Sequence, residues 1–228
     1  MLTQLSTQYP VNEVFQTIQG EGRFTGTPSV FLRLQGCPVG CPWCDTQHTW
    51  DIDPEKQTSV TDILAKSADD ATWFSASAES ILALFKQQGY SANHVVITGG
   101  EPAMFDLHAL TEQLHEQGYS VQIETSGTFE LRVSAQTWVT VSPKVDMRGG
   151  FAVLESALQR ANEIKHPVAM EKHIAELDEL IRRGVSSDCL IYLQPISQQQ
   201  RATELVIATC IERNWCLSLQ THKYLGIQ

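Results

Sequence analysis

The amino-acid sequence predicts an α/β fold in which parallel strands alternate with helices. After residue 76, short apolar segments rich in β-branched residues alternate with segments of helical periodicity. About six strands are expected, and the chain of 228 residues is shorter than the ~250 residues of a complete eight-fold barrel. An incomplete (β/α) barrel or a doubly wound sheet fits this count, within a single domain that spans residues 1–228.

The composition is that of a soluble globular protein. Hydrophobic residues make up 42% and charged residues 18% of the chain. A formal net charge of −10 argues against a nucleic-acid or anionic-membrane partner, although one site can still be locally positive. The sequence has no apolar run of about 18 residues and no secretory signal at its start. We therefore expect a cytoplasmic protein whose thiols stay reduced.

The first half of the chain contains three expected strands and two expected helices. The helix at 106–118 has Asp106 as a possible cap and Gly118 as its stop signal. In chain order we expect a strand at 29–36, a helix at 79–89, a strand at 94–98, a helix at 106–118 and a strand at 119–125. The long polar region at about 45–76 is interpreted as an insertion that covers one end of the sheet, with one short helix near 60–66.

The second half continues the alternation. Leu154 and Leu158 lie one helical turn apart, and Ser197 can cap the last long helix. In order we expect a strand at 138–143, a helix at 151–164, a short strand at 166–170, a helix at 174–184, a strand at 189–195, a helix at 198–214 and a strand at 216–221.

Unusual short motifs follow the expected strands. In order along the chain they are "QGC", "TGGEP", "ETSG", "SPK", "QPIS" and "QTHKY". Ligands of α/β folds gather where the carboxyl ends of the strands meet the loops. The motifs are therefore expected to share one site.

Three cysteines lie within eight positions, in the pattern C-x3-C-x2-C. Cys37, Cys41 and Cys44 can face a common point from one tight turn. Thiolates are the usual ligands of iron–sulfur clusters, and three of them would leave one iron of a four-iron cluster open. The alternative is a zinc site completed by His48 or Asp45, which ligand softness alone does not exclude.

The cysteine pattern, with Trp43 before the last cysteine and "TGGEP" (98–102) about 60 residues later, resembles the radical S-adenosylmethionine superfamily. The resemblance implies that the open iron of a 4Fe–4S cluster, held by Cys37, Cys41 and Cys44, chelates S-adenosylmethionine. It also implies that the cofactor contacts Trp43, Cys44, Asp45, Gly100, Glu101, Ser142, Pro143, Lys144, Gln194, Pro195, Ile196 and Ser197.

Further motifs along nearly the whole chain resemble one family of that superfamily, the 7-carboxy-7-deazaguanine synthases of queuosine biosynthesis. They are "QGEG" (19–22), "FLRLQGCP", "CDT", "TGGEP", "ETSG", "VSPK" and "QTHKYLGIQ". The resemblance implies a carbon–nitrogen lyase that converts 6-carboxy-5,6,7,8-tetrahydropterin to 7-carboxy-7-deazaguanine with loss of ammonia. It further implies an electron donor such as flavodoxin, a homodimer, and Mg²⁺ held by Thr46.

The substrate of that family suits the residues at the expected site. Glu21 can accept hydrogen bonds from the amidine-like edge of a pterin, and the forked guanidinium of Arg33 suits its carboxylate. The resemblance assigns substrate binding to Ile18, Gln19, Gly20, Glu21, Arg33, Thr98, His222 and Gln228. Radical chemistry would then belong to the cofactor, while the protein positions the reactants and excludes water.

Two other functions remain open from the sequence. A glycyl-radical activating enzyme would keep the superfamily but act on a protein, whereas the "QGEG" motif and Arg33 favour a small pterin. A zinc-binding module without enzymatic activity would use the same cysteines. Cys189, Cys210 and Cys216 are interpreted as structural.

Overall fold

A computed structural model describes residues 7–196 and 199–227. It contains one nine-stranded sheet in the order β3-β1-β2-β4-β5-β6-β7-β8-β9. Seven strands run parallel, and β1 pairs antiparallel with both β2 and β3 at one edge. The strands are β1 (Tyr9–Ile18), β2 (Pro28–Leu34), β3 (Phe74–Ala76), β4 (His94–Gly99), β5 (Ser120–Thr125), β6 (Trp138–Val141), β7 (Glu163–Val168), β8 (Leu190–Pro195) and β9 (Cys216–Leu217).

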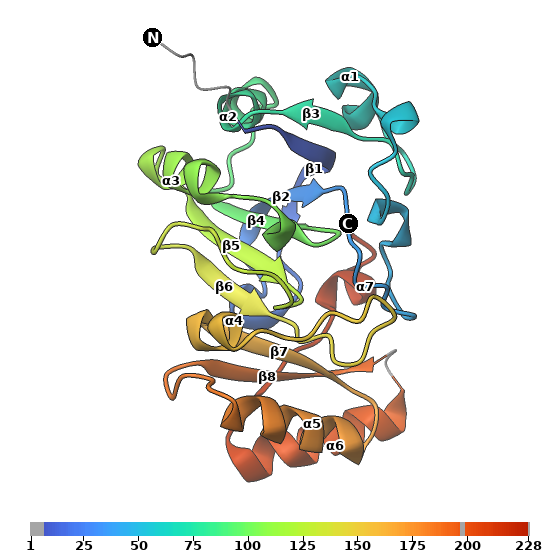
Figure 1. Ribbon diagram of the computed structural model, residues 1–228, viewed down its shortest axis with the longest axis vertical. Helices are drawn as coiled ribbons and strands as arrows, with labels where there is room; N and C mark the ends of the chain where they lie inside the picture. Colours follow the sequence, from blue (N-terminus) through green and yellow to red (C-terminus); the bar gives the residue numbers. More distant parts are fainter. Residues whose placement is uncertain (1–6, 197–198, 228) are drawn as a thin grey trace.

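The helices separate onto the two sides of this curved sheet (Figure 1). On the outer side lie α2 (Ala78–Gln87), α3 (His108–Glu116), α4 (Glu155–Arg160), α5 (Glu171–Arg182) and α6 (Gln200–Arg213). The inner side carries the 45–76 region, with α1 (Val60–Leu64), and the C-terminal α7 (Thr221–Leu225). Short 3-10 turns are η1 (Gly22–Phe24), η2 (Gln47–Thr49), η3 (Pro54–Lys56) and η4 (Pro102–Met104). The predicted fold class, an open α/β barrel, is confirmed.

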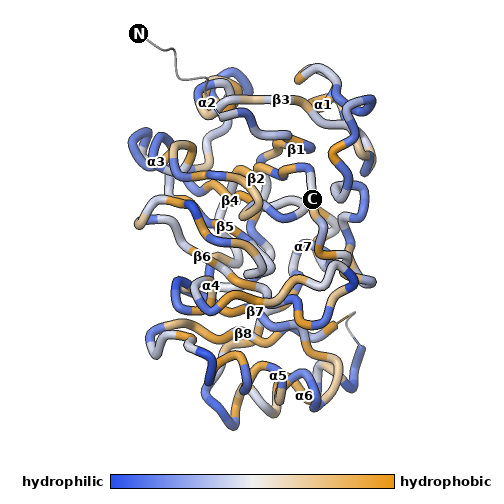
Figure 2. Tube along the Cα trace, in the orientation of Figure 1, coloured by the Kyte–Doolittle hydropathy of each residue, from blue (hydrophilic) through white to orange (hydrophobic). Residues whose placement is uncertain are grey.

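The core lies between the strands and the outer helices. Figure 2 shows hydrophobic residues along the central strands and hydrophilic residues along much of the outer helices. Ile97 and Ile123 of the sheet are fully buried, as are Leu110 and Leu114 of α3. Alternate residues of β5, β6 and β7 point to the inner face instead, and several are polar: Gln122, Glu124, Thr140, Glu163 and Lys165.

Several boundaries differ from the sequence-based expectation. The helix expected at 151–164 is the shorter α4, and β7 already begins at Glu163. Leu107, rather than the expected Asp106, is the N-cap residue of α3. Asp106 Oδ1 still accepts a 3.1 Å hydrogen bond from the N–H of His108, the first residue of the helix. The strand expected at 216–221 ends at Leu217, since residues from Thr221 form α7. The sequence reading also missed β1 and β3.

The 45–76 region forms short elements rather than one compact unit. Its expected helix is present as α1, where Ser59 and Asp62 form a capping box. The region ends in β3, which pairs with β1 at the sheet edge. None of the helices in the described ranges combines the length and apolar character needed to cross a bilayer.

Candidate active site

A cavity of about 320 Å³ opens at the carboxyl ends of the parallel strands. Its walls come from the ends of strands and the loops that follow β1, β2, β4, β5, β6, β8 and β9, as the position of the motifs led us to expect, and from Lys165 and Pro167 within β7. Among the residues expected at the site, those lining it are Glu21, Cys37, Cys41, Trp43, Cys44, Asp45, Thr46, Thr98, Gly100, Glu101, Ser142, Lys144, Gln194, Pro195 and Ile196.

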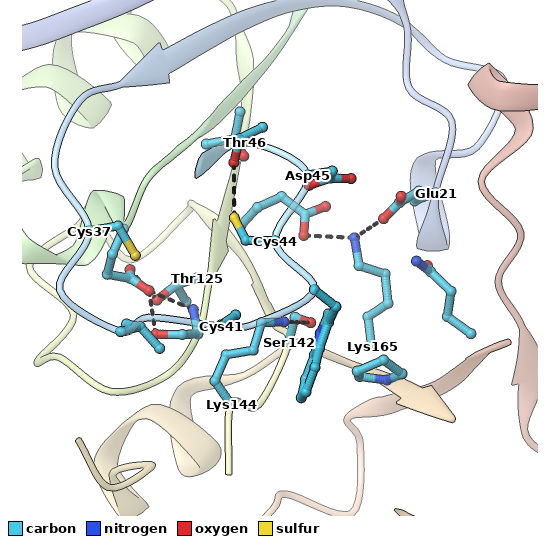
Figure 3. Close-up of a pocket in the computed structure, with 18 of the residues that line it drawn as sticks. Glu21, Cys37, Cys41, Cys44, Asp45, Thr46, Thr125, Ser142, Lys144 and Lys165 are labelled. Carbon is cyan, nitrogen blue, oxygen red and sulfur yellow. Dashed lines mark hydrogen bonds and ion pairs between the residues drawn. The ribbon is translucent and has the colours of Figure 1, made fainter. Parts of the chain in front are cut away.

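The three cysteines lie on the loop after β2 and face this cavity (Figure 3). Backbone hydrogen bonds fix the loop, from Gly36 N–H to the Thr49 carbonyl (2.7 Å) and from Cys37 N–H to the Trp50 carbonyl (2.9 Å). Burial raises the pKa of Cys37 to about 11 and also raises that of Cys41. Metal binding at these thiols would therefore displace their protons.

The spacing of the thiols helps to separate the two metal hypotheses. Among the described residues, the group of His, Cys, Asp and Glu donors whose atoms all lie within 4.8 Å of one another does not include these three sulfurs. Tetrahedral zinc with ~2.3 Å bonds would place its sulfurs about 3.8 Å apart. The donor set thus suits a multi-iron cluster better than one zinc ion.

The "TGGEP" loop packs directly against the cysteine loop. Gly100 N–H donates to the Leu34 carbonyl (3.0 Å), and Glu101 N–H donates to the Gly36 carbonyl (2.7 Å). A Cβ on Gly100 would lie 2.2 Å from the Gly36 oxygen. Glycine is therefore required here for the close approach of two backbones.

Glu101 joins the loops after β4 and β5. Its side chain is almost fully buried, and Oε1 accepts hydrogen bonds from Ala103 N–H (2.9 Å) and the Thr125 hydroxyl (2.6 Å). Oε2 accepts from Ser126 N–H (2.7 Å) and from the Ser126 hydroxyl. Because four donors converge on one carboxylate, Glu101 acts as a clamp on the cavity wall.

The residues after β6 and β8 form another wall. Lys144 Nζ donates a 2.7 Å hydrogen bond to the Ser142 hydroxyl, and burial lowers the pKa of Lys144. The Gln194 side chain accepts a 3.0 Å hydrogen bond from the Ser218 hydroxyl. Pro143 is not among the residues that line the cavity, and Ser197 falls outside the described residues.

A buried ion-pair network crosses the cavity floor. Lys165 Nζ lies 2.5 Å from Glu21 Oε2 and 2.8 Å from Glu124 Oε2. Burial alone would raise the pKa of Glu21, but Lys165 and the hydrogen bond from Gln220 lower it to about 2. For Glu124, burial raises the pKa despite the opposing effect of Lys165.

The C-terminal segment, residues 216–227, holds the "QGEG" loop, residues 19–22, from the other side. Thr221 donates to the Gly20 carbonyl through both its N–H and its hydroxyl, each at 3.0 Å. A Cβ on Gly20 would lie 2.5 Å from His222 Nδ1, so the two segments of the chain are in close contact here. Gly20 and His222 thus lie behind the cavity wall rather than on it.

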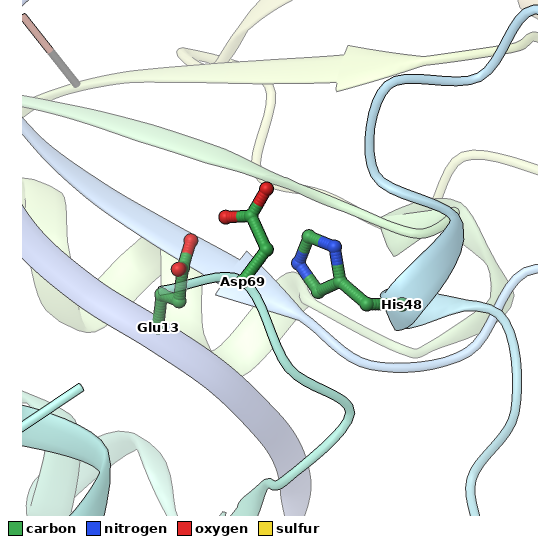
Figure 4. A group of neighbouring side chains, drawn as sticks. All are labelled: Glu13, His48 and Asp69. Carbon is green, nitrogen blue, oxygen red and sulfur yellow. The ribbon is translucent and has the colours of Figure 1, made fainter. Parts of the chain in front are cut away.

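Arg33 faces the same inner side as Thr98, its register partner, but does not line the cavity. Its Nε lies 2.7 Å from Glu13 Oε2. Figure 4 shows His48 and Asp69, from the 45–76 region, directed toward Glu13. Donor atoms of these three residues lie within 4.8 Å of one another. The predicted contact of Arg33 with a substrate therefore stays a prediction.

The remaining expected residues have mixed surroundings. Gln19 is buried, donating to the Gln122 side chain (3.3 Å) and accepting from Glu21 N–H (3.1 Å), and Ile18 ends β1. Thr46 Oγ1 lies 3.5 Å from the Gly99 carbonyl. Gln228 falls outside the described residues.

The sequence reading gave no individual role to several residues of this cavity. They are Lys165 and Glu124 of the network, Thr125 and Ser126 beside Glu101, and Gln220 and Lys223 of the C-terminal segment. The motifs "ETSG" and "QTHKY" had placed all of them except Lys165 at the expected site. A signal for Lys165 existed, since a charged residue inside a strand is costly to bury unless it is paired.

Comparison with known proteins agrees with this geometry. The radical SAM superfamily matches residues 32–144. The 7-carboxy-7-deazaguanine synthase of Escherichia coli strain K12 is 58% identical over 96% of this chain and 99% of its own length. That of Synechocystis is 34% identical over 98% and 96% of the two chains. The crystal structure of QueE from Escherichia coli superimposes with a TM-score of 0.92 at 57% identity, covering 93% of each chain.

Proposed function

This chain belongs to the family of 7-carboxy-7-deazaguanine synthases, and on that premise we propose that it converts 6-carboxy-5,6,7,8-tetrahydropterin to 7-carboxy-7-deazaguanine with loss of ammonia, as a carbon–nitrogen lyase of queuosine biosynthesis. The observation that carries this proposal is the meeting of the three cysteines, the "TGGEP" loop and the Glu21–Lys165–Glu124 network in one cavity.

The radical SAM superfamily implies a 4Fe–4S cluster and S-adenosylmethionine. Cys37, Cys41 and Cys44 would hold the cluster, which when bound supplies the electron for cleavage of S-adenosylmethionine. Gly100, Glu101, Ser142, Lys144, Gln194, Pro195 and Ile196 line the part of the cavity where that cofactor would lie.

The opposite part of the cavity suits the pterin. Glu21 stays ionised at neutral pH because Lys165 lowers its pKa, and a carboxylate can accept two hydrogen bonds from the amidine-like edge. Glu13 engages Arg33 through Nε, which leaves the terminal amino groups of the guanidinium for the substrate carboxylate. Arg33 itself lies outside the cavity lining, whereas Thr98, its register partner, lines the cavity beside it.

Mg²⁺ at Thr46 is part of the proposal. The Thr46 hydroxyl lies near the cavity and beside the Gly99 carbonyl, and hard oxygen donors suit this ion. Thr46→Val should abolish stimulation of turnover by added Mg²⁺ and leave the iron content unchanged. Equal stimulation in the natural chain and the variant would contradict the assignment.

Four further points extend the proposal beyond this cavity. They are electron delivery by a flavodoxin-like donor, a homodimer, a cytoplasmic location, and a single domain with the 45–76 insertion. Exposed Trp43 beside the cysteines gives an electron donor a surface close to the cluster loop.

Anaerobic turnover tests the main proposal. The reconstituted protein, S-adenosylmethionine, a reductant and the carboxypterin should yield 7-carboxy-7-deazaguanine by mass spectrometry. Cys44→Ala should yield none, whereas Cys216→Ala, which alters an exposed free cysteine of β9, should match the natural chain.

Other outcomes of the same preparation favour the alternatives. A different substrate, such as a protein, would be favoured if the preparation holds iron and cleaves S-adenosylmethionine but does not convert the pterin. Bound zinc without iron would favour the zinc-binding module.

A further inference from the structure

Glu163 is a buried acid beneath the proposed substrate site that the proposed reaction leaves without a role. It lies on β7, two residues before Lys165, so both side chains point to the inner face. The residue has no exposed surface. Its carboxyl group is therefore part of the layer that supports the cavity floor.

The carboxyl group of Glu163 contacts the backbone of the loop that carries Glu21. Arg23 N–H donates a 3.0 Å hydrogen bond to Oε2. Oε1 is buried and has no hydrogen-bond partner among the described residues. A Cβ on Gly22 would lie 2.1 Å from that oxygen, and Gly22 has a φ of +64°. The loop thus rests on this carboxyl group, and only glycine fits at the contact.

The charges around Glu163 do not balance if all acids ionise. Lys165 lies between Glu21 and Glu124 and forms ion pairs with both. Glu163 forms no such ion pair within the described part of the chain, so its negative charge would compete for the same lysine. Burial and the charge of Glu124 raise the pKa of Glu163 to about 7, against smaller lowering effects of Lys165 and the Arg23 N–H.

Few other charged groups face Glu163 from the neighbouring elements. The strand β8 contributes Cys189 and Tyr192, which stay neutral near pH 7 because burial raises the pKa of each to about 12. From η1, Arg23 presents its backbone N–H, and β6 contributes the uncharged indole of Trp138. Glu124 and Lys165 are thus the charged side chains that matter most to its ionisation.

We propose that Glu163 is a positioning residue for the pterin: with its proton in place it holds the 19–24 loop so that Glu21 faces the substrate, and loss of that proton weakens substrate binding. The proposal rests on the proposed function. Ionised Glu163 would draw Lys165 away from Glu21 and set a third negative charge under the loop, which changes the direction of the Glu21 carboxylate.

The test compares the substrate KM across pH 6 to 8.5 in the natural chain and in two variants. Glu163→Gln keeps an acceptor for Arg23 N–H but has no proton to lose. Glu163→Leu removes the acceptor. Glu116→Gln, an exposed acid on α3, is the matched control. Because every protein receives the same substrate, titration of the pterin itself cancels in the comparison.

We expect the substrate KM of the natural chain and of the control to rise about ten-fold between pH 6 and about pH 8, one unit to either side of pH 7, because the protonated fraction of Glu163 falls by that factor. The KM of Glu163→Gln should stay low and flat, and that of Glu163→Leu should be high at every pH. The KM of S-adenosylmethionine should change little in all of them. A Glu163→Gln profile that rises like that of the natural chain would overturn the proposal.

A second measurement covers variants that fold poorly. Quenching of the pterin's fluorescence on binding to the iron-loaded protein gives the dissociation constant without turnover. Gly22→Ala, which drives a methyl group into the same carboxyl oxygen while Glu163 remains, should weaken this binding. Unchanged binding would refute the contact. Failure of the natural chain to make product would instead refute the proposed function, so the two are distinguishable.

Discussion

Replacement of Glu101 by glutamine is expected to destabilise the cavity wall by a calculable amount. The carboxylate accepts four hydrogen bonds, and glutamine keeps one oxygen for Ala103 N–H and the Thr125 hydroxyl. Its amide group would face Ser126 N–H, so a donor would meet a donor. A buried unsatisfied donor costs about 1–3 kcal/mol, and two bonds to oxygen lose charge assistance worth about 1 kcal/mol in all.

The expected loss is thus about 2–4 kcal/mol. For a chain of 228 residues, an unfolding entropy of about 2.1 cal/mol/K per residue converts this loss to a fall in Tm of about 4–8 °C. Differential scanning fluorimetry under anaerobic conditions measures it. Glu130→Gln is the matched control, because Glu130 is exposed and accepts only from the Ser156 hydroxyl. A Tm within 1 °C of that control would refute the clamp.

Three further predictions concern other contacts of the site. Gly100→Ala should lower the iron bound after reconstitution, because its methyl group displaces the Gly36 backbone; iron equal to that of the natural chain would contradict this. Ser218→Ala should raise the substrate KM about five-fold, the effect of ~1 kcal/mol, since Gly22 N–H loses its 3.1 Å acceptor; an unchanged KM would argue against it. Glu21 has a pKa lowered to about 2, so its stabilising contribution is complete above about pH 4.3 and is lost as pH falls toward 2. The Tm difference between the natural chain and Glu21→Gln should therefore be constant above pH 5 and shrink in acid, as thermal scans across pH would show; a constant difference down to pH 2 would be inconsistent with the ion pair.

The parts of the fold that follow local rules were predictable from sequence. The apolar run of β4 and the stop at Gly118 needed only propensity and turn chemistry. The clustering of motifs at the carboxyl ends followed from the parallel topology. Neither inference required knowledge of side-chain contacts.

Two strands that the sequence reading missed or misplaced have identifiable physical causes. The sequence reading placed the start of β7 too late, at 166 instead of Glu163, because the inward residues Glu163 and Lys165 are charged and break the apolar pattern of a buried strand. The burial of Lys165 is tolerated through its ion pairs with Glu21 and Glu124, residues far away in sequence. Strand β1 was hidden for a different reason: its antiparallel pairing lies outside the strand–helix alternation on which the reading relied.

The contact between Gly20 and Thr221 has a consequence for how the protein is made. The two residues are 201 positions apart, so neither hydrogen bond to the Gly20 carbonyl can form before Thr221 has been synthesised. At about 5–20 residues per second, a ribosome needs roughly 10–40 s to cover that distance. Throughout that interval the nascent chain carries a substrate loop without its far support. The support of the substrate loop by Thr221 therefore forms late in synthesis, after most of the strands have been made.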